Sequence, residues 1–196
     1  MEHYYSEEQK SFLSIKKIKQ NINGTEFEFY TSSGIFSKDK IDAGTMVLAE
    51  NMIIGKNSKV LDIGCGIGVL GIAAAKIFDA EIAMSDLNKR AVMLAKKNIK
   101  LNNVNAEIYQ GNLYEKIKDN DFDVILSNPP QNAGREICFK LIEQSKNHLK
   151  PGGNLQLVAR HNKGGKTLSK KMEDVFGNVK AVAKKSGYWV YMGVKE

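Results

Sequence analysis

The sequence predicts an α/β fold, with a mostly parallel sheet of seven strands that ends in an antiparallel C-terminal hairpin. Short apolar runs alternate with helical segments over most of the chain. One such run, 59–63, enters a glycine-rich turn and leaves as an alanine-rich helix, which is the arrangement of a nucleotide-type site. The last two strands are joined through Ser186-Gly187, a link too short for a parallel crossover, so they must be antiparallel.

The N-terminal segments lie ahead of this α/β unit and are predicted to add a β-hairpin and a helix to it. Asn23-Gly24 is the strongest short-range hairpin signal available, and it separates strands expected at 15–22 and 26–30. Asp42-Ala43-Gly44-Thr45 is expected to open a helix that runs to about Met52.

The core that follows is predicted to alternate strands with helices. Its strands are expected at residues 59–63, 80–85, 106–110, 122–127, 154–160, 179–184 and 188–194. Its helices are expected at residues 69–78, 88–101, 134–148 and 166–176. Asn88 is a good N-cap for the second helix, and Pro151-Gly152-Gly153 predicts an abrupt turn before the fifth strand.

Length and composition indicate one domain, 1–196, in which an extension at 1–52 precedes the cofactor-binding and catalytic core at 53–196. The chain shows no transmembrane run and no signal peptide, so we expect a soluble, cytoplasmic protein with no membrane partner. Cys65 and Cys138 have no C-x-x-C spacing and no histidine at ligand spacing, which disfavours a disulfide or a metal site.

The net charge of +7, with an isoelectric point near 9.2, suggests a polyanionic partner, although a lysine-rich composition in general would also give it. The basic residues form groups at Lys16, Lys17 and Lys19, at Arg160, Lys163, Lys166, Lys170 and Lys171, and at Lys184 and Lys185. Each group could be an ordinary solvated face. Because they flank the expected base-binding loop, we favour nucleic acid as the partner.

The glycine-rich turn and an acidic residue further along are the first candidate binding residues. Gly66, Gly68 and Gly71 satisfy G-x-G-x-x-G, where glycines let the backbone approach a ligand closely. Asp86 follows the second core strand, where ribose hydroxyls are usually held. Taken alone, this pattern suits NAD, FAD or a methyl donor equally.

The tetrapeptide Ser127-Asn128-Pro129-Pro130, at the end of the apolar run 122–126, indicates a reaction. The side-chain oxygen of Asn128 and the carbonyl of Pro129 are two neighbouring acceptors, and the proline rings stiffen them. Two acceptors without a donor fit an exocyclic NH2 group. A strand followed by an ordinary Pro-Pro turn is the alternative.

Together these motifs resemble those of the class I S-adenosylmethionine-dependent methyltransferases, which have D-x-G-x-G-x-G first and N-P-P fourth. The resemblance implies a Rossmann-like fold, S-adenosyl-L-methionine as the cofactor, and transfer to nitrogen. It assigns cofactor binding to Asp62, Gly64, Gly66, Gly68, Asp86, Leu87, Asn112, Leu113 and Asn128. It assigns catalysis to Asn128, Pro129 and Pro130.

Over nearly the whole chain, the sequence is similar to the small-subunit ribosomal RNA guanine-N2 methyltransferases. The similar segments are 3–6, 34–37, 42–48, 176–177 and 186–188, besides the two core motifs. The bacterial members resemble two such domains in one chain, and this chain looks like the catalytic half alone, as in small archaeal homologues. The resemblance implies RNA as the substrate, with the basic groups or a homodimer replacing the missing half.

The chain departs from the family after the second proline, where Gln131 replaces the usual aromatic residue that stacks on a flipped base. Phe36 is the candidate for the stacking residue. Alternatively, Phe36 is a core residue that anchors its loop. The expected substrate-binding residues are Phe36, Gln131, Lys163 and Lys166. The competing functions are a protein glutamine methyltransferase acting on release factors and a non-catalytic RNA-binding module.

Overall fold

The computed structural model describes residues 14–32, 40–130 and 134–196. Phe36 and Gln131, both expected to contact substrate, lie outside the described residues. In chain order the elements are β1 (Ile15–Ile22), β2 (Thr25–Ser32), α1 (Ala43–Asn51), β3 (Lys59–Ile63), α2 (Val69–Phe78), β4 (Glu81–Asp86), α3 (Lys89–Leu101), β5 (Glu107–Gln110), β6 (Phe122–Ser127), α4 (Arg135–His148), β7 (Leu149–Arg160), a wide turn (His161–Gly165), α5 (Lys166–Phe176), β8 (Lys180–Lys185) and β9 (Tyr188–Val194).

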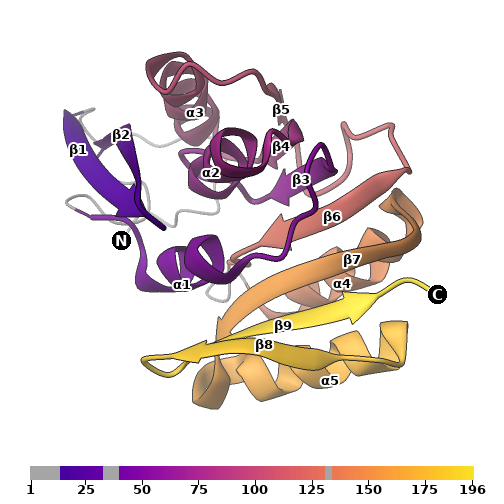
Figure 1. Cartoon of the computed structure of the whole chain (residues 1–196). Coiled ribbons are helices and arrows are strands. Elements are labelled where there is room, and N and C mark those ends of the chain that lie inside the picture. Colours follow the sequence, from indigo (N-terminus) through magenta and orange to yellow (C-terminus); the bar gives the residue numbers. More distant parts are fainter. Residues whose placement is uncertain (1–13, 33–39, 131–133) are drawn as a thin grey trace.

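A sheet of seven strands forms the centre of the molecule, in the order β5-β4-β3-β6-β7-β9-β8 (Figure 1). The strands from β5 to β7 are parallel, and β9 runs antiparallel to both of its neighbours. This confirms the predicted parallel sheet with an antiparallel C-terminal hairpin. The predicted helix at 166–176 has the same bounds in the structure.

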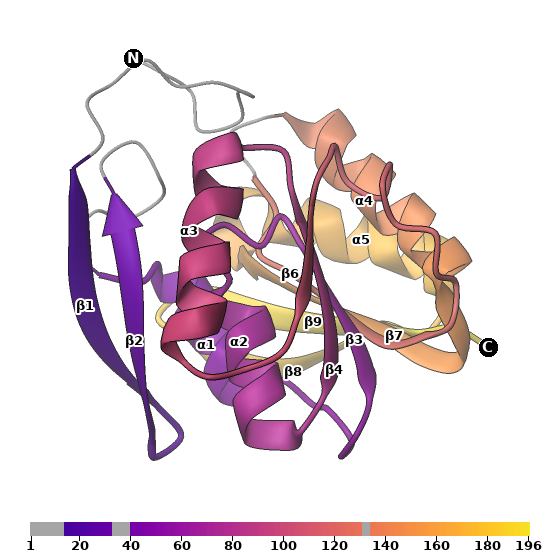
Figure 2. The same cartoon turned by 90° about the horizontal axis from the view of Figure 1, so that it is seen from above.

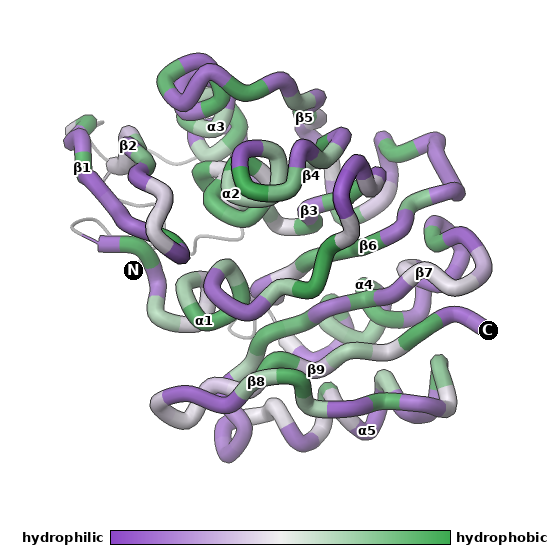
Figure 3. The backbone as a smooth tube through the Cα atoms, viewed as in Figure 1, coloured by the Kyte–Doolittle hydropathy of each residue, from purple (hydrophilic) through white to green (hydrophobic). Residues whose placement is uncertain are grey.

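Helices cover both faces of the sheet and bury two apolar layers (Figure 2). Leu48 of α1, Ile72 of α2 and Leu94 of α3 are buried on one face. Leu141 of α4 and Met172 of α5 are buried on the other. In Figure 3, helix α2 is mostly green, whereas the outlying strand β1 is largely purple. Burial of the apolar surface in these two layers is the main stabilising contribution to the fold.

The N-terminal strands β1 and β2 pair only with each other in the described structure, as predicted, and form an antiparallel hairpin beside α3. Two asparagine side chains, Asn98 in α3 and Asn102 at its C-cap, bind the free edge of β2. Asn98 bonds to both the N–H and the C=O of Tyr30, and Asn102 does the same at Glu28. These amides, one helical turn apart, satisfy backbone groups that a neighbouring strand would otherwise pair.

The abrupt turn predicted at Pro151-Gly152-Gly153 is wrong, because these residues lie inside β7. The pairing register of β6 with β7 shifts between Phe122 and Val124, so this stretch is an irregularity within the strand. A side chain at Gly153 would place its Cβ 2.7 Å from the carbonyl oxygen of Phe122, so glycine is required there by close backbone approach. None of the described helices is long and apolar enough to cross a membrane.

Candidate active site

The carboxyl ends of the central parallel strands bring the glycine-rich turn and the Asn-Pro-Pro segment together. Strand β3 pairs with β4 on one side and with β6 on the other. The hydroxyl of Ser127, the last residue of β6, donates to the carbonyl of Ile63, the last residue of β3, at 2.8 Å. The two motifs therefore start from neighbouring strand ends, where ligands bind in open α/β sheets.

The glycine turn has the backbone that its sequence requires. Gly64, Gly66 and Gly68 all have positive φ values, of 70°, 56° and 88°, which L-residues with a side chain rarely adopt. Gly64 is exposed and Gly66 is partly buried, whereas Gly68 is buried, so a ligand can approach the turn at Gly64. Gly71 has a different role: a Cβ there would lie 2.7 Å from the sulfur of Met84, so this glycine allows α2 to pack closely on β4.

Asp62 is fully buried beside the turn, and half of its carboxylate lacks a partner. Its Oδ2 accepts the N–H of Gly71 at 3.0 Å, whereas Oδ1 has no hydrogen-bond partner among the described residues. Burial, aided by the nearby charge of Asp86, raises the pKa of Asp62 to about 7. A cationic ligand next to Oδ1 would stabilise the ionised form of this buried group.

Asp86 ties the tip of β4 to the glycine turn. Its Oδ2 accepts the N–H of Gly66 and its Oδ1 accepts the N–H of Asn88, both at 2.8 Å. The side chain is almost fully buried, and Leu87 beside it is half-buried. Both carboxylate oxygens of Asp86 are hydrogen-bond acceptors, the kind of group that could bind hydroxyl groups at this strand tip.

The loop after β5 is fixed next to Asp86. The N–H of Gly111 donates to the carbonyl of Asp86 at 3.1 Å, and the hydroxyl of Ser85 donates to the carbonyl of Leu113 at 3.0 Å. Leu113 is itself buried and has a positive φ of 52°. Asn112 is exposed between them. The structure thus brings the predicted cofactor residues from three strand ends to one place.

The side chain of Asn128 is held by the start of helix α1. Its Nδ2 donates to Oδ2 of Asp42 at 2.8 Å and to Oγ1 of Thr45 at 2.9 Å. Sequence reasoning placed Asp42 at the opening of this helix, where its side chain accepts the N–H of Thr45 as the N-cap, but it missed both contacts to Asn128. The only available signal was the similarity of segment 42–48 to the same family as the Asn-Pro-Pro motif.

Lys163 is exposed in the wide turn that follows β7, and Lys166 is exposed at the start of α5 directly after it. The turn is joined to the β8–β9 hairpin, because the N–H of His161 donates to the carbonyl of Gly187. Cations lie over aromatic rings at this corner: Arg160 lies 5.1 Å from the ring centre of Tyr188, and Lys184 lies 4.0 Å from that of Trp189.

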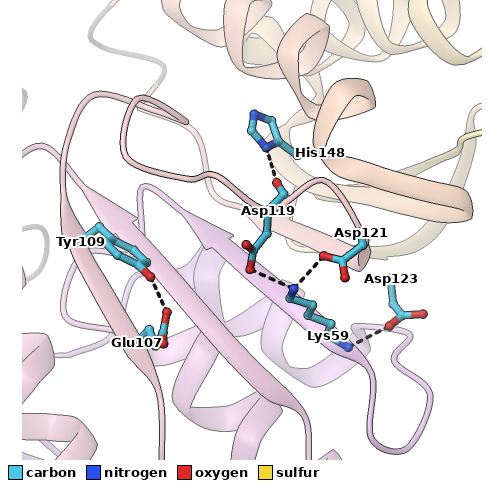
Figure 4. A network of polar contacts seen from close by, with 7 residues as sticks. All are labelled: Lys59, Glu107, Tyr109, Asp119, Asp121, Asp123 and His148. Carbon is cyan, nitrogen blue, oxygen red and sulfur yellow. Dashed lines mark hydrogen bonds and ion pairs between the residues drawn. The ribbon is translucent and has the colours of Figure 1, made fainter.

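A second polar network belongs to the opposite end of the sheet (Figure 4). Lys59, at the start of β3, bonds to the carboxylates of Asp119 and Asp121 and through its backbone N–H to Asp123. Burial lowers the pKa of Lys59, but the hydrogen bonds to the two aspartates outweigh this effect and raise the pKa above its ordinary value. This network joins strands at their amino ends and is remote from the glycine turn.

The model of the family described as Methyltransferase small domain matches residues 26–192. The chain belongs to this family. Among its relatives, the Bacillus subtilis protein YbxB, named as uncharacterized, is 36% identical over 99% of this chain and 98% of its own length. The ribosomal RNA small subunit methyltransferase C of Photorhabdus laumondii is 33% identical over 85% of this chain, which matches 49% of that protein. The chain therefore spans about half the length of the ribosomal RNA relatives that it matches.

Solved structures of methyltransferases share the fold. The Thermus thermophilus 16S rRNA N2 G1207 methyltransferase, in complex with AdoMet and guanosine, superposes with a TM-score of 0.82 at 23% identity and covers 93% of this chain and 51% of its own. A Pyrococcus furiosus methyltransferase superposes with a TM-score of 0.68 at 24% identity, over 76% of this chain and 80% of its own. These likenesses confirm the predicted Rossmann-like methyltransferase fold.

Proposed function

We propose that this methyltransferase uses S-adenosylmethionine to methylate an exocyclic amine of a base in RNA, namely guanine N2 in small-subunit ribosomal RNA. The observation that carries the proposal is the fixed amide of Asn128, whose two N–H groups are already bound, so its oxygen is left to accept from a substrate amine. The ribosomal RNA relatives and the guanosine-bound Thermus structure support the choice of base.

The residues at the strand ends fit the cofactor. The glycine turn, which is exposed at Gly64, and the unpaired Oδ1 of Asp62 would face its amino acid moiety, whose ammonium would compensate the buried carboxylate. Asp86 would accept from the ribose hydroxyls, and Asn112 would contact the polar edge of adenine. When bound, S-adenosylmethionine supplies an electrophilic methyl group, whose transfer breaks a C–S bond, forms an N–C bond and ends with loss of one proton from nitrogen.

The work of the protein in this reaction is alignment. Asn128 Oδ1 and the Pro129 carbonyl would accept the two N–H groups of the amine, so that the nitrogen lone pair points along the C–S axis. These acceptors would also stabilise the positive charge that develops on nitrogen. No strong base is needed, because the methylated, cationic nitrogen is acidic and loses its proton to water.

The surface charge supports RNA as the partner. Lys171 and Lys185 are neutralised by Glu143 and Glu50, whereas Arg160, Lys163, Lys166 and Lys184 make no ion pair with a described acidic residue. These four side chains occupy the corner formed by the end of β7, the wide turn and the β8–β9 hairpin. Here phosphates of an RNA strand would meet unpaired cations next to aromatic rings. A second copy of the chain could add to this surface in a homodimer.

Methylation of unmodified ribosomal RNA tests the proposal directly. Small subunits and free RNA from a strain lacking the gene would be incubated with the protein and methyl-labelled cofactor, and the nucleosides would be identified by mass spectrometry. We expect N2-methylguanosine. A methyl group on a ring carbon, a ribose oxygen or a release-factor glutamine would contradict the assignment. Calorimetry should show binding of S-adenosylmethionine and not of NAD.

A further inference from the structure

Both hydrogens of the Asn128 side-chain amide are bound by the first turn of helix α1, through Asp42 Oδ2 at 2.8 Å and Thr45 Oγ1 at 2.9 Å. An ionised carboxylate can only accept hydrogen bonds, so the atom of Asn128 that faces Asp42 must be the nitrogen. The orientation of the amide therefore follows from the chemistry of its hydrogen-bond partners. We name Asp42 and Thr45 together the α1 clamp.

The clamp resolves an ambiguity that an asparagine at this position would otherwise have. The terminal torsion of asparagine is broad and roughly two-fold, so a free amide can present either its oxygen or its NH2 group. A substrate amine is a hydrogen-bond donor, and an NH2 group turned toward it would oppose donor to donor. Holding both hydrogens on the far side leaves only the productive orientation.

The clamp is itself rigid because its atoms are fixed by the backbone and the sheet. The same Asp42 Oδ2 that binds Asn128 also caps helix α1, accepting the N–H of Thr45 at 3.0 Å. The first turn of α1 lies directly against β9, since a Cβ at Gly44 would be 2.9 Å from Cε1 of Tyr188. The N-terminal extension thus reaches the reaction centre through α1, 83 and 86 residues before Asn128.

We propose, on the basis of the proposed N-methyl transfer, that Asp42 and Thr45 are positioning residues that turn Asn128 Oδ1 toward the acceptor amine. Neither residue touches the substrate. Their contribution is to the alignment of the transition state, so their loss should lower kcat and leave the affinity for cofactor and the KM for RNA nearly unchanged.

Thr45→Val removes the acceptor while conserving the shape of the side chain, and Thr45→Ser retains it. For the loss of one aligning hydrogen bond we expect kcat to fall about three- to tenfold in Thr45→Val and to recover in Thr45→Ser. Asp42→Ser keeps a helix-capping hydroxyl on a side chain too short to reach Asn128, and should also lower kcat. Asn51→Ala is the control on the same helix, because its amide bonds only to the Val47 carbonyl one turn earlier, and its kcat should equal that of the parent.

A double-mutant cycle separates positioning from general destabilisation. If the clamp acts through Asn128, Thr45→Val should have no further effect on kcat in an Asn128→Ala background. Additive losses would overturn the proposal, as would a parental kcat in Thr45→Val.

The side-chain amide of Asn128 can also be observed without substrate. Its NMR signals, assigned by their loss in Asn128→Ala, should exchange slowly with solvent in the parent and faster in Thr45→Val. Parental exchange in Thr45→Val would overturn the clamp even if methylation of guanine N2 were confirmed. Conversely, slow exchange in a parent that methylates no amine would contradict the proposed function alone.

Discussion

The two halves of the carboxyl edge of the sheet are held in different ways. In the glycine-turn half, carboxylates bind nearby backbone: Asp62 reaches Gly71, 9 residues on, and Asp86 reaches Gly66, 20 residues back. In the Asn-Pro-Pro half, Asn128 binds side chains 83 and 86 residues earlier in the chain. The first half is assembled within one βαβ unit, whereas the second depends on where an N-terminal helix packs.

This difference predicts a separation of effects. Changes in the glycine-turn half should alter cofactor affinity and local stability together, because the carboxylates that we propose to bind the cofactor also bind the backbone of the turn. Changes in the Asn128 half should alter turnover while the cofactor still binds. The following variants test that separation.

Asn128→Ala should have the largest effect. It removes a hydrogen bond that is made best in the transition state, so we expect kcat to fall about 10²-fold or more. Cofactor affinity, measured by calorimetry, should remain near that of the parent. Near-parental turnover on the RNA that the parent enzyme methylates would show that Asn128 does not align the amine. Gln131→Ala, three residues further on, should have a milder effect.

Asp86→Ala should act mainly on cofactor affinity, in contrast to Asn128→Ala, which should act on kcat. Loss of charge-assisted hydrogen bonds to the ribose should weaken cofactor binding by about 1–3 kcal/mol. The variant also leaves the N–H groups of Gly66 and Asn88 without their acceptor, so its melting temperature should fall as well. Calorimetry and thermal unfolding measure the two effects. Unchanged cofactor affinity would remove Asp86 from the binding site.

The same comparison explains how much the sequence could predict. Strand ends and the glycine turn follow from local signals, since periodicity and glycine spacing act over a few residues, and the predicted seven-stranded, mostly parallel sheet was confirmed. Contacts formed by single amides across the fold leave no such signal. The bonds of Asn98 to Tyr30, of Asn102 to Glu28, and of Asn128 to the α1 clamp were all missed for this reason.

The error at Pro151-Gly152-Gly153 has a different cause. Proline and two glycines are typical of a turn, and Gly152 does have a positive φ of 78°. The neighbouring chain nevertheless pairs there, because the N–H of Gly152 donates to the carbonyl of Lys195 and that of Lys195 to the carbonyl of Gly153. Tertiary pairing with the last strand's extension overrode the local preference.

Binding of the cofactor should depend on pH through Asp62, because burial raises the pKa of this carboxyl group to about 7. Because the folded pKa lies above the ordinary value, the carboxyl group stabilises the free protein most below its ordinary pKa, and this contribution is lost as pH rises through about 7. A cationic ligand favours the carboxylate. Below pH 7, cofactor affinity should therefore increase by up to about tenfold for each unit by which the pH is raised. Binding in this range should release the proton of the Asp62 carboxyl group.

Calorimetry between about pH 5.5 and 7.5 in buffers of different ionisation enthalpy would measure both quantities. In Asp62→Asn the pH dependence over this range and the proton release should disappear. An affinity that is independent of pH in the parent would show that the ammonium does not compensate Asp62. This outcome would leave the prediction for Asp86 intact, so the two carboxylates can be judged separately.

The smallest individual effects are expected on the basic corner, which belongs to neither half of the edge. Each exposed cation that contacts a phosphate should add about 0.7–0.9 to the slope of log affinity against log salt. Replacing Arg160, Lys163, Lys166 and Lys184 together with glutamine should flatten this slope for ribosomal RNA and leave cofactor affinity unchanged. The control replaces Lys171 and Lys185, which are already paired with Glu143 and Glu50; because it removes two charges and not four, the slope changes are compared per charge removed. If the control flattened the slope as much as the unpaired set, overall charge and not this corner would account for RNA binding.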